Sequence, residues 1–420
     1  MKKLLIPLAA ILALTACSKV VPTTVDAGER EVTFEVANYV ASTKAGEKSL
    51  AQEFGTFHTF AIFHSTDPAN PNQWFFLDEE IFSEGEGGKI SKWAPAGSHF
   101  WPKTGDISFY SYAGTRQPSE WPQPGKEDDN SRIMSFGVNV NAGQDQGFEP
   151  LIIRGIPEVG ENGTDFLPAD NILVADPAYK FQESVADPYG VDQLNPAKGV
   201  PTLFHHMLAK VRFQLVLDAT DSDANTTWTL SLPEMQHLLS VPNEGSLVVR
   251  YPAIPSTYNT VVPFGTDAMW SVEMGNKSFA EIWARPMQLV AEGNVRVPAK
   301  DEDNLISVPE IEGQVFEREF VVIPQRFDDL AFHFECVLSN VYTGGEKEEP
   351  GVTETIRIPA NPRTVATMGM FIPDYNPQQE YYWEMNHVYT YRIVVKTNGE
   401  ITFDPAVADW TPEETENPEF

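Results

Sequence analysis

The 420-residue chain is expected to be an all-β protein built as two β-sandwich domains in tandem. Its apolar residues mostly alternate with polar ones at period two, which is typical of strands that bury one face. Its 28 glycines and 33 prolines are spread between these segments, where they mark turns. The sequence shows no long amphipathic helical pattern. A mature length of about 400 residues suggests two domains, with three as the alternative.

Alternating segments run through the whole chain. The clearest are residues 32–36, 107–112, 211–217 and 389–395. Near the C-terminal end, Tyr391–Lys396 and Ile401–Phe403 flank Asn398-Gly399, which favours a type I′ turn and therefore a β-hairpin.

The boundary between the two sandwiches is expected near residue 250, after the alternating segments around Phe213 and Trp228. The N-terminal domain would then comprise residues 45–250 and the C-terminal domain residues 251–420. Residues 17–44 precede both domains and begin with a short polar stretch, which is typical of a tether.

The chain begins with a secretory signal of the lipoprotein kind. Met1-Lys2-Lys3 is charged, Leu4–Ala16 is apolar, and small residues stand just before Cys17. The apolar segment is too short for a membrane-spanning helix, which takes roughly 20 residues. Residues 1–16 are therefore expected to be removed and acyl chains such as palmitate attached to Cys17. The alternative is a plain cleaved signal with an incidental cysteine, and both place the protein in the bacterial envelope.

The composition is strongly acidic. The chain has 29 Lys and Arg against 60 Asp and Glu, so loss of Lys2 and Lys3 leaves 27 basic residues and a side-chain charge of −33. Such a surface repels nucleic acid and anionic lipid headgroups. Cys336 is the only cysteine left if Cys17 carries lipid, and it falls on the apolar side of an alternating segment. We expect a buried structural thiol there, with no disulfide.

The sequence contains no recognisable catalytic or metal-binding motif. A Gly-x-Ser-x-Gly elbow, a phosphate-binding Gly-rich loop and His-Glu-x-x-His are all absent. His205 and His206 are neighbours on a predicted strand, so they point to opposite faces and do not share an ion. Asp221–Asn225 begins like a calcium loop, but Thr226 replaces the required Gly and Leu232 the required Glu. We expect no enzymatic activity, no cofactor and no bound metal.

Several segments, taken in order, resemble the fimbrillin family of Bacteroidales-type bacteria, the Mfa-like and FimA-like type V pilus subunits. The family's pattern of Trp-Pro followed by an aromatic strand is similar to residues 100–113, and its central strand pair is similar to residues 171–175 and 203–213. Ile323-Pro324-Gln325 and the closing segment Trp383–Trp410 complete the match. The resemblance extends over nearly the whole mature chain.

The resemblance implies transthyretin-like sandwiches and a structural role in a cell-surface fimbrium at the outer membrane that supports adhesion. In such pili the precursor is exported as a lipoprotein, and a trypsin-like protease cuts behind the first strand. A strand from a neighbouring subunit then fills the vacated groove by strand addition. On this sequence the removable strand corresponds to Glu31–Val40, and cleavage to the bond between Lys44 and Ala45, where the family usually has Arg.

Three apolar side chains of the removable strand, Val32, Phe34 and Val36, are expected on one face. Their burial is worth roughly 5 to 9 kcal/mol, comparable with the whole stability of a domain, about 5 to 15 kcal/mol. A domain that loses this strand therefore needs another. The alternative is an ordinary first strand followed by a solvated Lys44.

The position in the filament, as stalk, tip or accessory subunit, stays open. Thr411–Phe420 is acidic and holds two prolines, which makes it a poor donor strand and favours a tip or accessory subunit. A lipid retained on Cys17 would indicate an anchor. The alternative function is a monomeric surface lipoprotein that binds a host glycan or protein through exposed aromatics. Candidates for such aromatics are Trp74, Trp93 and Trp121, although core packing is the more common use of any one tryptophan.

Overall fold

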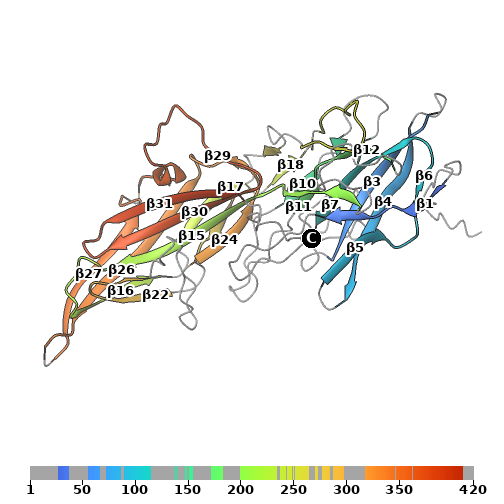
Figure 1. Cartoon of the computed structure of the whole chain (residues 1–420). Coiled ribbons are helices and arrows are strands. Elements are labelled where there is room, and N and C mark those ends of the chain that lie inside the picture. The colour runs from blue at the N-terminus through green and yellow to red at the C-terminus, as the bar shows by residue number, and fades with distance from the viewer. Residues whose placement is uncertain are drawn as a thin grey trace, which may run out of the picture.

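A computed structural model of the chain describes residues 27–36, 55–66, 72–86, 89–114, 138–139, 147–148, 151–154, 172–182, 199–233, 237–242, 244–247, 249, 251–263, 270–272, 277–283, 287–297, 317–345, 347–361 and 363–409. These residues form strands joined by turns and loops, and their one helix is the 3₁₀ turn η2 (Met368–Phe371). The predicted all-β class is therefore confirmed. The described strands lie in two groups along the long axis of the molecule (Figure 1).

The N-terminal group is a ten-stranded curled sheet with the order β13-β2-β5-β4-β3-β7-β11-β14, in which β12 also pairs with β7 and β19 with β12. Its strands are β2 (Phe34–Val36), β3 (Thr56–His64), β4 (Asn72–Glu86), β5 (Lys89–Pro95), β7 (Asp106–Gly114), β11 (Ile172–Ala175), β12 (Ala178–Phe181), β13 (Val200–Thr202), β14 (Phe204–His206) and β19 (Thr260–Val261). Aromatic residues fill its core, with Phe57, Phe109, Phe181 and Trp101 all fully buried.

This sheet curls back on itself. Strands β13 and β14 are separated in sequence only by Leu203, yet they stand at opposite ends of the sheet order. The chain between them therefore brings the two ends together. β2 is the strand that continues the sheet from β5 to β13.

The C-terminal group is a sandwich of two sheets. One has the order β23-β15-β30-β31 with β24 also on β15, and the other has the order β21-β17-β26-β16-β22 with β27 and β28 also on β26. The first sheet consists of β15 (Ala209–Asp218), β23 (Arg296–Val297), β24 (Glu317–Val322), β30 (His387–Lys396) and β31 (Ile401–Asp409). The second consists of β16 (Thr226–Leu232), β17 (Leu238–Pro242), β21 (Lys277–Glu281), β22 (Met287–Glu292), β26 (Ala331–Tyr342), β27 (Glu349–Ile358) and β28 (Ala366–Thr367).

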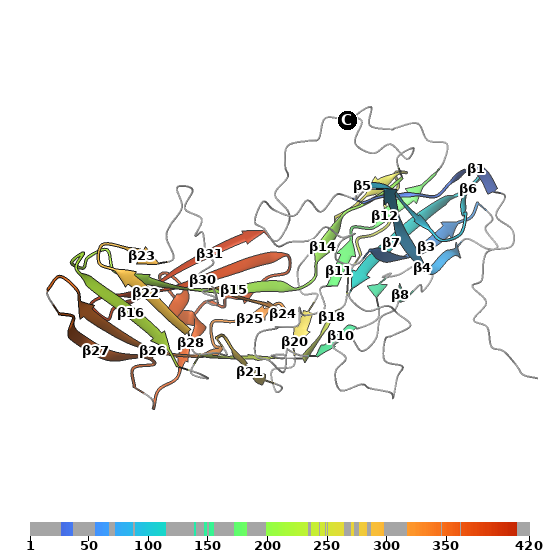
Figure 2. The same ribbon diagram turned by 90° about the horizontal axis from the view of Figure 1, so that it is seen from below.

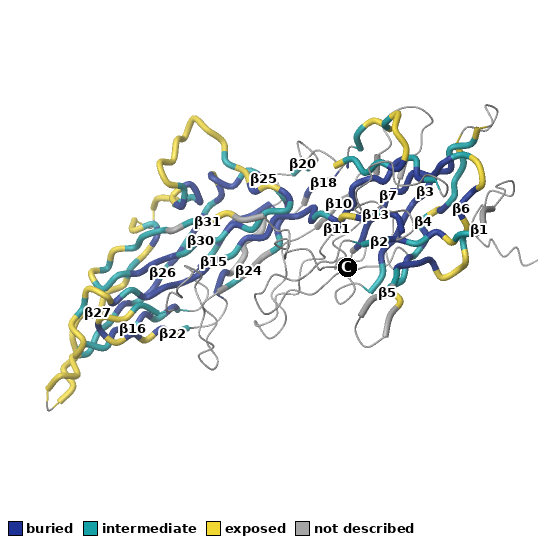
Figure 3. The backbone as a smooth tube through the Cα atoms, in the orientation of Figure 1, coloured by how far each residue is buried: buried dark blue, intermediate teal, exposed yellow. Residues whose placement is uncertain are grey.

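The two sheets of this sandwich share one apolar core. The ring of Phe213 from β15 stacks on that of Phe332 from β26, with centroids 6.0 Å apart. Cys336 also lies in this core on β26, fully buried as predicted. Figure 3 shows the buried strands of the sandwich in dark blue and the far end of the β26–β27 hairpin exposed in yellow.

The remaining strands form small sheets. These are β1 (Ala27–Glu31) with β6 (Phe100–Pro102), β8 (Val138–Asn139) with β9 (Gly147–Phe148), β10 (Leu151–Arg154) with β18 (Glu244–Leu247) and β20 (Trp270–Val272), and β25 (Gln325–Arg326) with β29 (Tyr382–Trp383). A third apolar cluster joins the two groups of strands, because it contains Tyr110 from β7 together with Ile323 and Met385. Figure 2 shows the same succession of the two groups from below.

β14 belongs to the N-terminal sheet and the next strand, β15, to the C-terminal sandwich. The chain later returns to the N-terminal group with β19, which pairs with β12. The chain thus crosses between the two groups more than once around residue 250. The division into domains 45–250 and 251–420 stays a prediction.

The predicted C-terminal hairpin is confirmed, but its turn differs from the expected type. β30 and β31 pair antiparallel from His387–Asp409 to Val395–Ile401. Within this turn, only Gly399 has a positive φ, +80°, and its N–H donates to the carbonyl of Lys396 at 3.0 Å. This is a type I turn followed by a left-handed glycine, whereas a type I′ turn needs a positive φ at Asn398 as well.

Candidate strand-insertion site

Of the predicted removable strand Glu31–Val40, the structure describes residues 31–36, and Phe34–Val36 (β2) lies inside the N-terminal sheet, whereas residues 37–40 lie outside the described residues. Residues 27–36 form two short strands, β1 paired with β6 and β2 placed between β5 and β13. Val32 and Thr33 separate the two, and both make backbone bonds at this break. The Val32 N–H donates to the His99 carbonyl at 2.7 Å, and the Thr33 carbonyl accepts from the Val200 N–H at 2.7 Å. The segment is therefore held from both sides.

β2 has different relations to its two neighbours. It runs parallel to β13, in a register that places Phe34 opposite Val200 and Val36 opposite Thr202. On its other side Phe34 pairs with Trp93 of antiparallel β5. β13 pairs with no described strand other than β2. Without β2, the curled sheet would therefore be open between β5 and β13.

Two of the three predicted side chains are fully inserted. Val32 and Phe34 are each 1% exposed, and the ring of Phe34 meets those of Phe57 and Phe109 edge-on at centroid distances of 5.4 and 5.5 Å. Val36 is half-buried against the same core. The three side chains therefore share one face, as the alternation predicts. Aromatic pairs in this geometry contribute about 0.5–1.5 kcal/mol beyond the burial of their area.

Gly199 fixes how closely the segment packs against β13. Its φ is +128°, a conformation that favours glycine. A Cβ at this position would lie 2.6 Å from the carbonyl carbon of Phe34 and 2.8 Å from the nitrogen of Glu35. The backbone of β2 therefore occupies space that any side chain at position 199 would take. Sequence reasoning did not single out Gly199, because the close approach joins positions 165 residues apart.

The geometry allows one strand to be replaced by another without rebuilding the sheet. Val32 and Phe34 are worth roughly 1.5–3 kcal/mol each on burial, and the backbone groups on either side of the segment could pair with another extended chain that has an N–H at the position of Val32. The two rings that meet Phe34 edge-on, those of Phe57 on β3 and Phe109 on β7, belong to other strands of the sheet. Removal of the segment would therefore expose an apolar groove lined by Phe57, Trp93 and Phe109.

The other predicted site residues lie outside the described residues. These are Cys17, the expected site of lipid attachment, and Lys44 with Ala45, the expected site of cleavage. Their predicted roles stay predictions. In the part of the chain that the structure describes, no helix is long and apolar enough to cross a membrane.

The two adjacent histidines occupy different environments. Nε2 of His205 lies 2.9 Å from Oδ2 of the buried Asp176, whereas His206 is buried on the opposite face of β14. Burial and the nearby Lys210 lower the pKa of His206 below its usual range. Among the described residues, no three His, Cys, Asp or Glu side chains are grouped to hold a metal ion.

The proposed aromatic platform is not formed by the tryptophans within the described residues. Trp93 is buried in the N-terminal core and contacts Phe57, and Trp74 is half-buried beside Phe60. Trp121 lies outside the described residues. The structure instead places exposed tyrosines on the loop that leads from η2 to β29.

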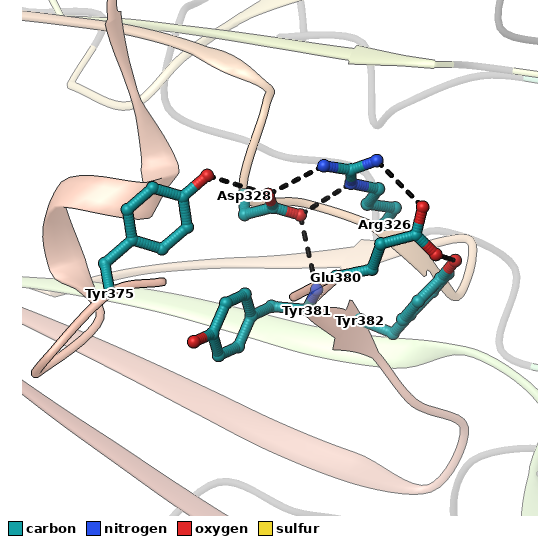
Figure 4. A network of polar contacts seen from close by, with 6 residues as sticks. All are labelled: Arg326, Asp328, Tyr375, Glu380, Tyr381 and Tyr382. Carbon is teal, nitrogen blue, oxygen red and sulfur yellow. Dashed lines mark hydrogen bonds and ion pairs between the residues drawn. The ribbon is translucent and has the colours of Figure 1, made fainter. Parts of the chain in front are cut away.

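A polar network anchors this loop at the buried carboxylate of Asp328 (Figure 4). Arg326 donates to both oxygens of Asp328 at 2.8 and 3.0 Å, the hydroxyl of Tyr375 donates at 3.0 Å, and the N–H of Tyr381 donates at 3.3 Å. Arg326 also donates to Glu380, which accepts a bond from Tyr382. The bonds from Arg326 lower the pKa of Asp328, and the bond to Asp328 raises that of Tyr375.

Neither a protein-family model nor a curated protein matches the chain. Among solved structures, a "putative cell adhesion protein" from Bacteroides ovatus has a TM-score of 0.37 and 12% identity, covering 92% of this chain and 99% of that chain. One of the same description from Bacteroides uniformis has a TM-score of 0.35, 12% identity, and coverage of 91% and 98%. The tip fimbrial protein Mfa3 from Porphyromonas gingivalis has a TM-score of 0.28, 12% identity, and coverage of 86% and 95%. These three solved structures are described as cell adhesion or fimbrial proteins.

Proposed function

We propose that the chain is a structural subunit of a cell-surface fimbrium that supports adhesion and is assembled by strand exchange. In this proposal the protein is exported as a lipoprotein on Cys17, and a trypsin-like protease cleaves between Lys44 and Ala45. The released segment carries β1 and β2 away. A strand from a neighbouring subunit then fills the groove between β5 and β13. The role is assembly and binding, without catalysis or a cofactor.

The position of β2 is the observation that supports this proposal. It completes a curled sheet between two strands that do not pair with each other, and it inserts Val32 and Phe34 into a core built by the rest of the sheet. A subunit that loses such a segment keeps a formed groove of defined register. Strand addition at a sheet edge uses backbone bonds for affinity and alternate side chains for specificity.

The C-terminal end of the described chain favours a tip or accessory subunit over a stalk subunit. All nine residues of β31 pair with β30. Donating this strand to a neighbour would break that ladder and remove Phe403 from its contact with Phe371, whose ring centroid lies 4.4 Å away. The residues that follow β31 are acidic and contain two prolines, which suits them poorly to a sheet.

The test is to determine the N-terminus and the assembly state of the protein isolated from its native cell surface. Mass spectrometry and denaturing gels run without boiling measure these two properties. We expect a chain that begins at Ala45 and forms a ladder of stable oligomers. The variant Lys44→Ala should keep the segment and lose the ladder, whereas the matched variant Lys48→Ala should behave as the wild type.

An acylated Cys17 on a monomer that still carries β1 and β2 would contradict the proposal. It would leave two functions to pursue, a membrane anchor of the fimbrium and a monomeric surface lipoprotein that binds a host molecule. Ladders that persist in Lys44→Ala would reject cleavage at this bond but retain assembly. The two parts of the proposal are therefore tested separately.

A further inference from the structure

We propose that the loop from η2 to β29, residues 373–382, is a binding platform for neutral carbohydrate. It belongs to the C-terminal group of strands and takes no part in the insertion of β2. Residues 373–380 are all exposed. Within or next to this stretch, Tyr375 and Tyr382 are themselves 37% and 49% exposed.

The loop is fixed from inside by bonds that leave its outer surface free for a ligand. Asp328 holds Tyr375 and the backbone of Tyr381 (Figure 4). The Tyr381 carbonyl accepts from the Phe327 N–H at 3.0 Å, which ties the loop to the edge of the sandwich core. Asn376 accepts a bond from the N–H of Gln378 within the loop. A loop ordered in this way loses little conformational entropy on binding, so more of the contact energy remains as affinity.

The residue types of the loop suit a sugar. Its ten residues include three tyrosines, two prolines and three side-chain amides. Exposed tyrosine rings offer rigid apolar faces for the C–H face of a pyranose, and amides donate to and accept from its hydroxyls. Tyr and Asn are also the residues that antibody binding loops use for adaptable recognition at low entropic cost. The amides are those of Asn376, Gln378 and Gln379.

The charge around the loop selects among sugars. Arg326, the cation of the network, is shared by Asp328 and Glu380. Further exposed carboxylates are those of Asp374 within the loop, Glu384 two residues after it, and Asp329 next to Asp328 in sequence. An anionic sugar, sialylated or sulfated, would meet net negative charge here and be repelled. The platform therefore fits an uncharged saccharide.

The test is binding of the full mature chain to an array of neutral oligosaccharides that end in galactose, fucose, mannose or N-acetylglucosamine, printed beside sialylated and sulfated forms of the same glycans. We expect binding to a subset of the neutral glycans. Tyr382→Ala should weaken it by about tenfold or more, as expected from the loss of one stacked ring. Gln379→Ala, which removes an exposed amide, should weaken it without changing the melting temperature.

The matched control is Tyr342→Ala, which removes a tyrosine of similar exposure, 41%, from β26. This variant should bind as the wild type does. The proposal is overturned if no neutral glycan binds, if only the charged forms bind, or if Tyr342→Ala loses as much binding as Tyr382→Ala. If the loop surface binds a basic protein and no glycan, a protein-binding role would replace the proposal.

Discussion

Replacing Phe34 by alanine tests whether β2 is held in the N-terminal sheet by its inserted side chain. The ring is 1% exposed and contacts Phe57 and Phe109 edge-on. Deleting a buried phenylalanine typically costs about 3–5 kcal/mol, against a total domain stability of about 5–15 kcal/mol. Most of this loss should fall on the pairing of β2 with β5 and β13, because the alanine leaves a cavity where these strands meet.

The assay is backbone hydrogen exchange followed by mass spectrometry on the uncleaved chain. A loss of about 3–5 kcal/mol in local stability should speed exchange in β5 and β13 by between about a hundredfold and a few thousandfold. The β26 strand serves as the internal reference, because it belongs to the other core. The variant Val365→Ala, at an exposed position, controls for the substitution itself. Exchange in β5 and β13 that stays within a factor of three of the wild type would refute the reasoning.

Three further predictions concern single residues. Gly199→Ala should loosen β2 and accelerate its exchange, since its Cβ would overlap the Phe34 backbone; Gly345→Ala, whose Cβ meets no atom closer than 3.4 Å, should leave exchange unchanged. Asp328→Asn should lower the melting temperature at pH 7. Because Arg326 lowers the pKa of Asp328, the stabilisation by the carboxylate is complete above its unfolded pKa of about 3.9 and is lost as the pH falls through the folded value. The difference in melting temperature from wild type should therefore shrink as the pH falls below about 3.9, and a difference that does not shrink on acidification would contradict it. In a form of the protein that lacks Cys17, Cys336 should not react with a thiol reagent at pH 8 until the chain is unfolded, because burial raises the pKa of its thiol to about 12. Labelling of the folded protein at the same rate as the unfolded protein would contradict the burial of Cys336.

Local patterns in the sequence were enough to predict the strands but not their partners. The alternation over 107–112, 211–217 and 389–395 corresponds to β7, β15 and β30, because a strand that buries one face needs that pattern wherever it pairs. The parallel pairing of β2 with β13 joins residues 34 and 200, and no local pattern encodes a partner at that distance. The break of the first segment at Val32 and Thr33 has the same origin, since it follows from bonds to His99 and Val200.

Turn chemistry and exposure were the other points where local reasoning was incomplete. The dipeptide Asn398-Gly399 marks a hairpin correctly, but both hairpin turn types place glycine at the left-handed position, so the dipeptide does not decide between them. The tryptophans suggested as an exposed platform include the buried Trp93, since a large aromatic residue in an alternating segment usually faces the core. The exposed Tyr375 is bonded to the buried Asp328, which is distant in sequence, and the exposed Tyr382 is bonded to Glu380, and no local pattern indicates the first of these contacts.

The contacts of the inserted segment define what a replacement strand needs. It must present an N–H where Val32 donates to His99, which excludes proline at that position. Two residues later it must carry a large apolar side chain to fill the space between Phe57 and Phe109, and its backbone must pass close to Gly199. Within residues 411–420 the one large apolar residue is Phe420, and the residue two positions before it is Pro418, so this stretch does not combine the two features. A segment of a neighbouring subunit that combines these features is the donor that the proposed strand exchange requires.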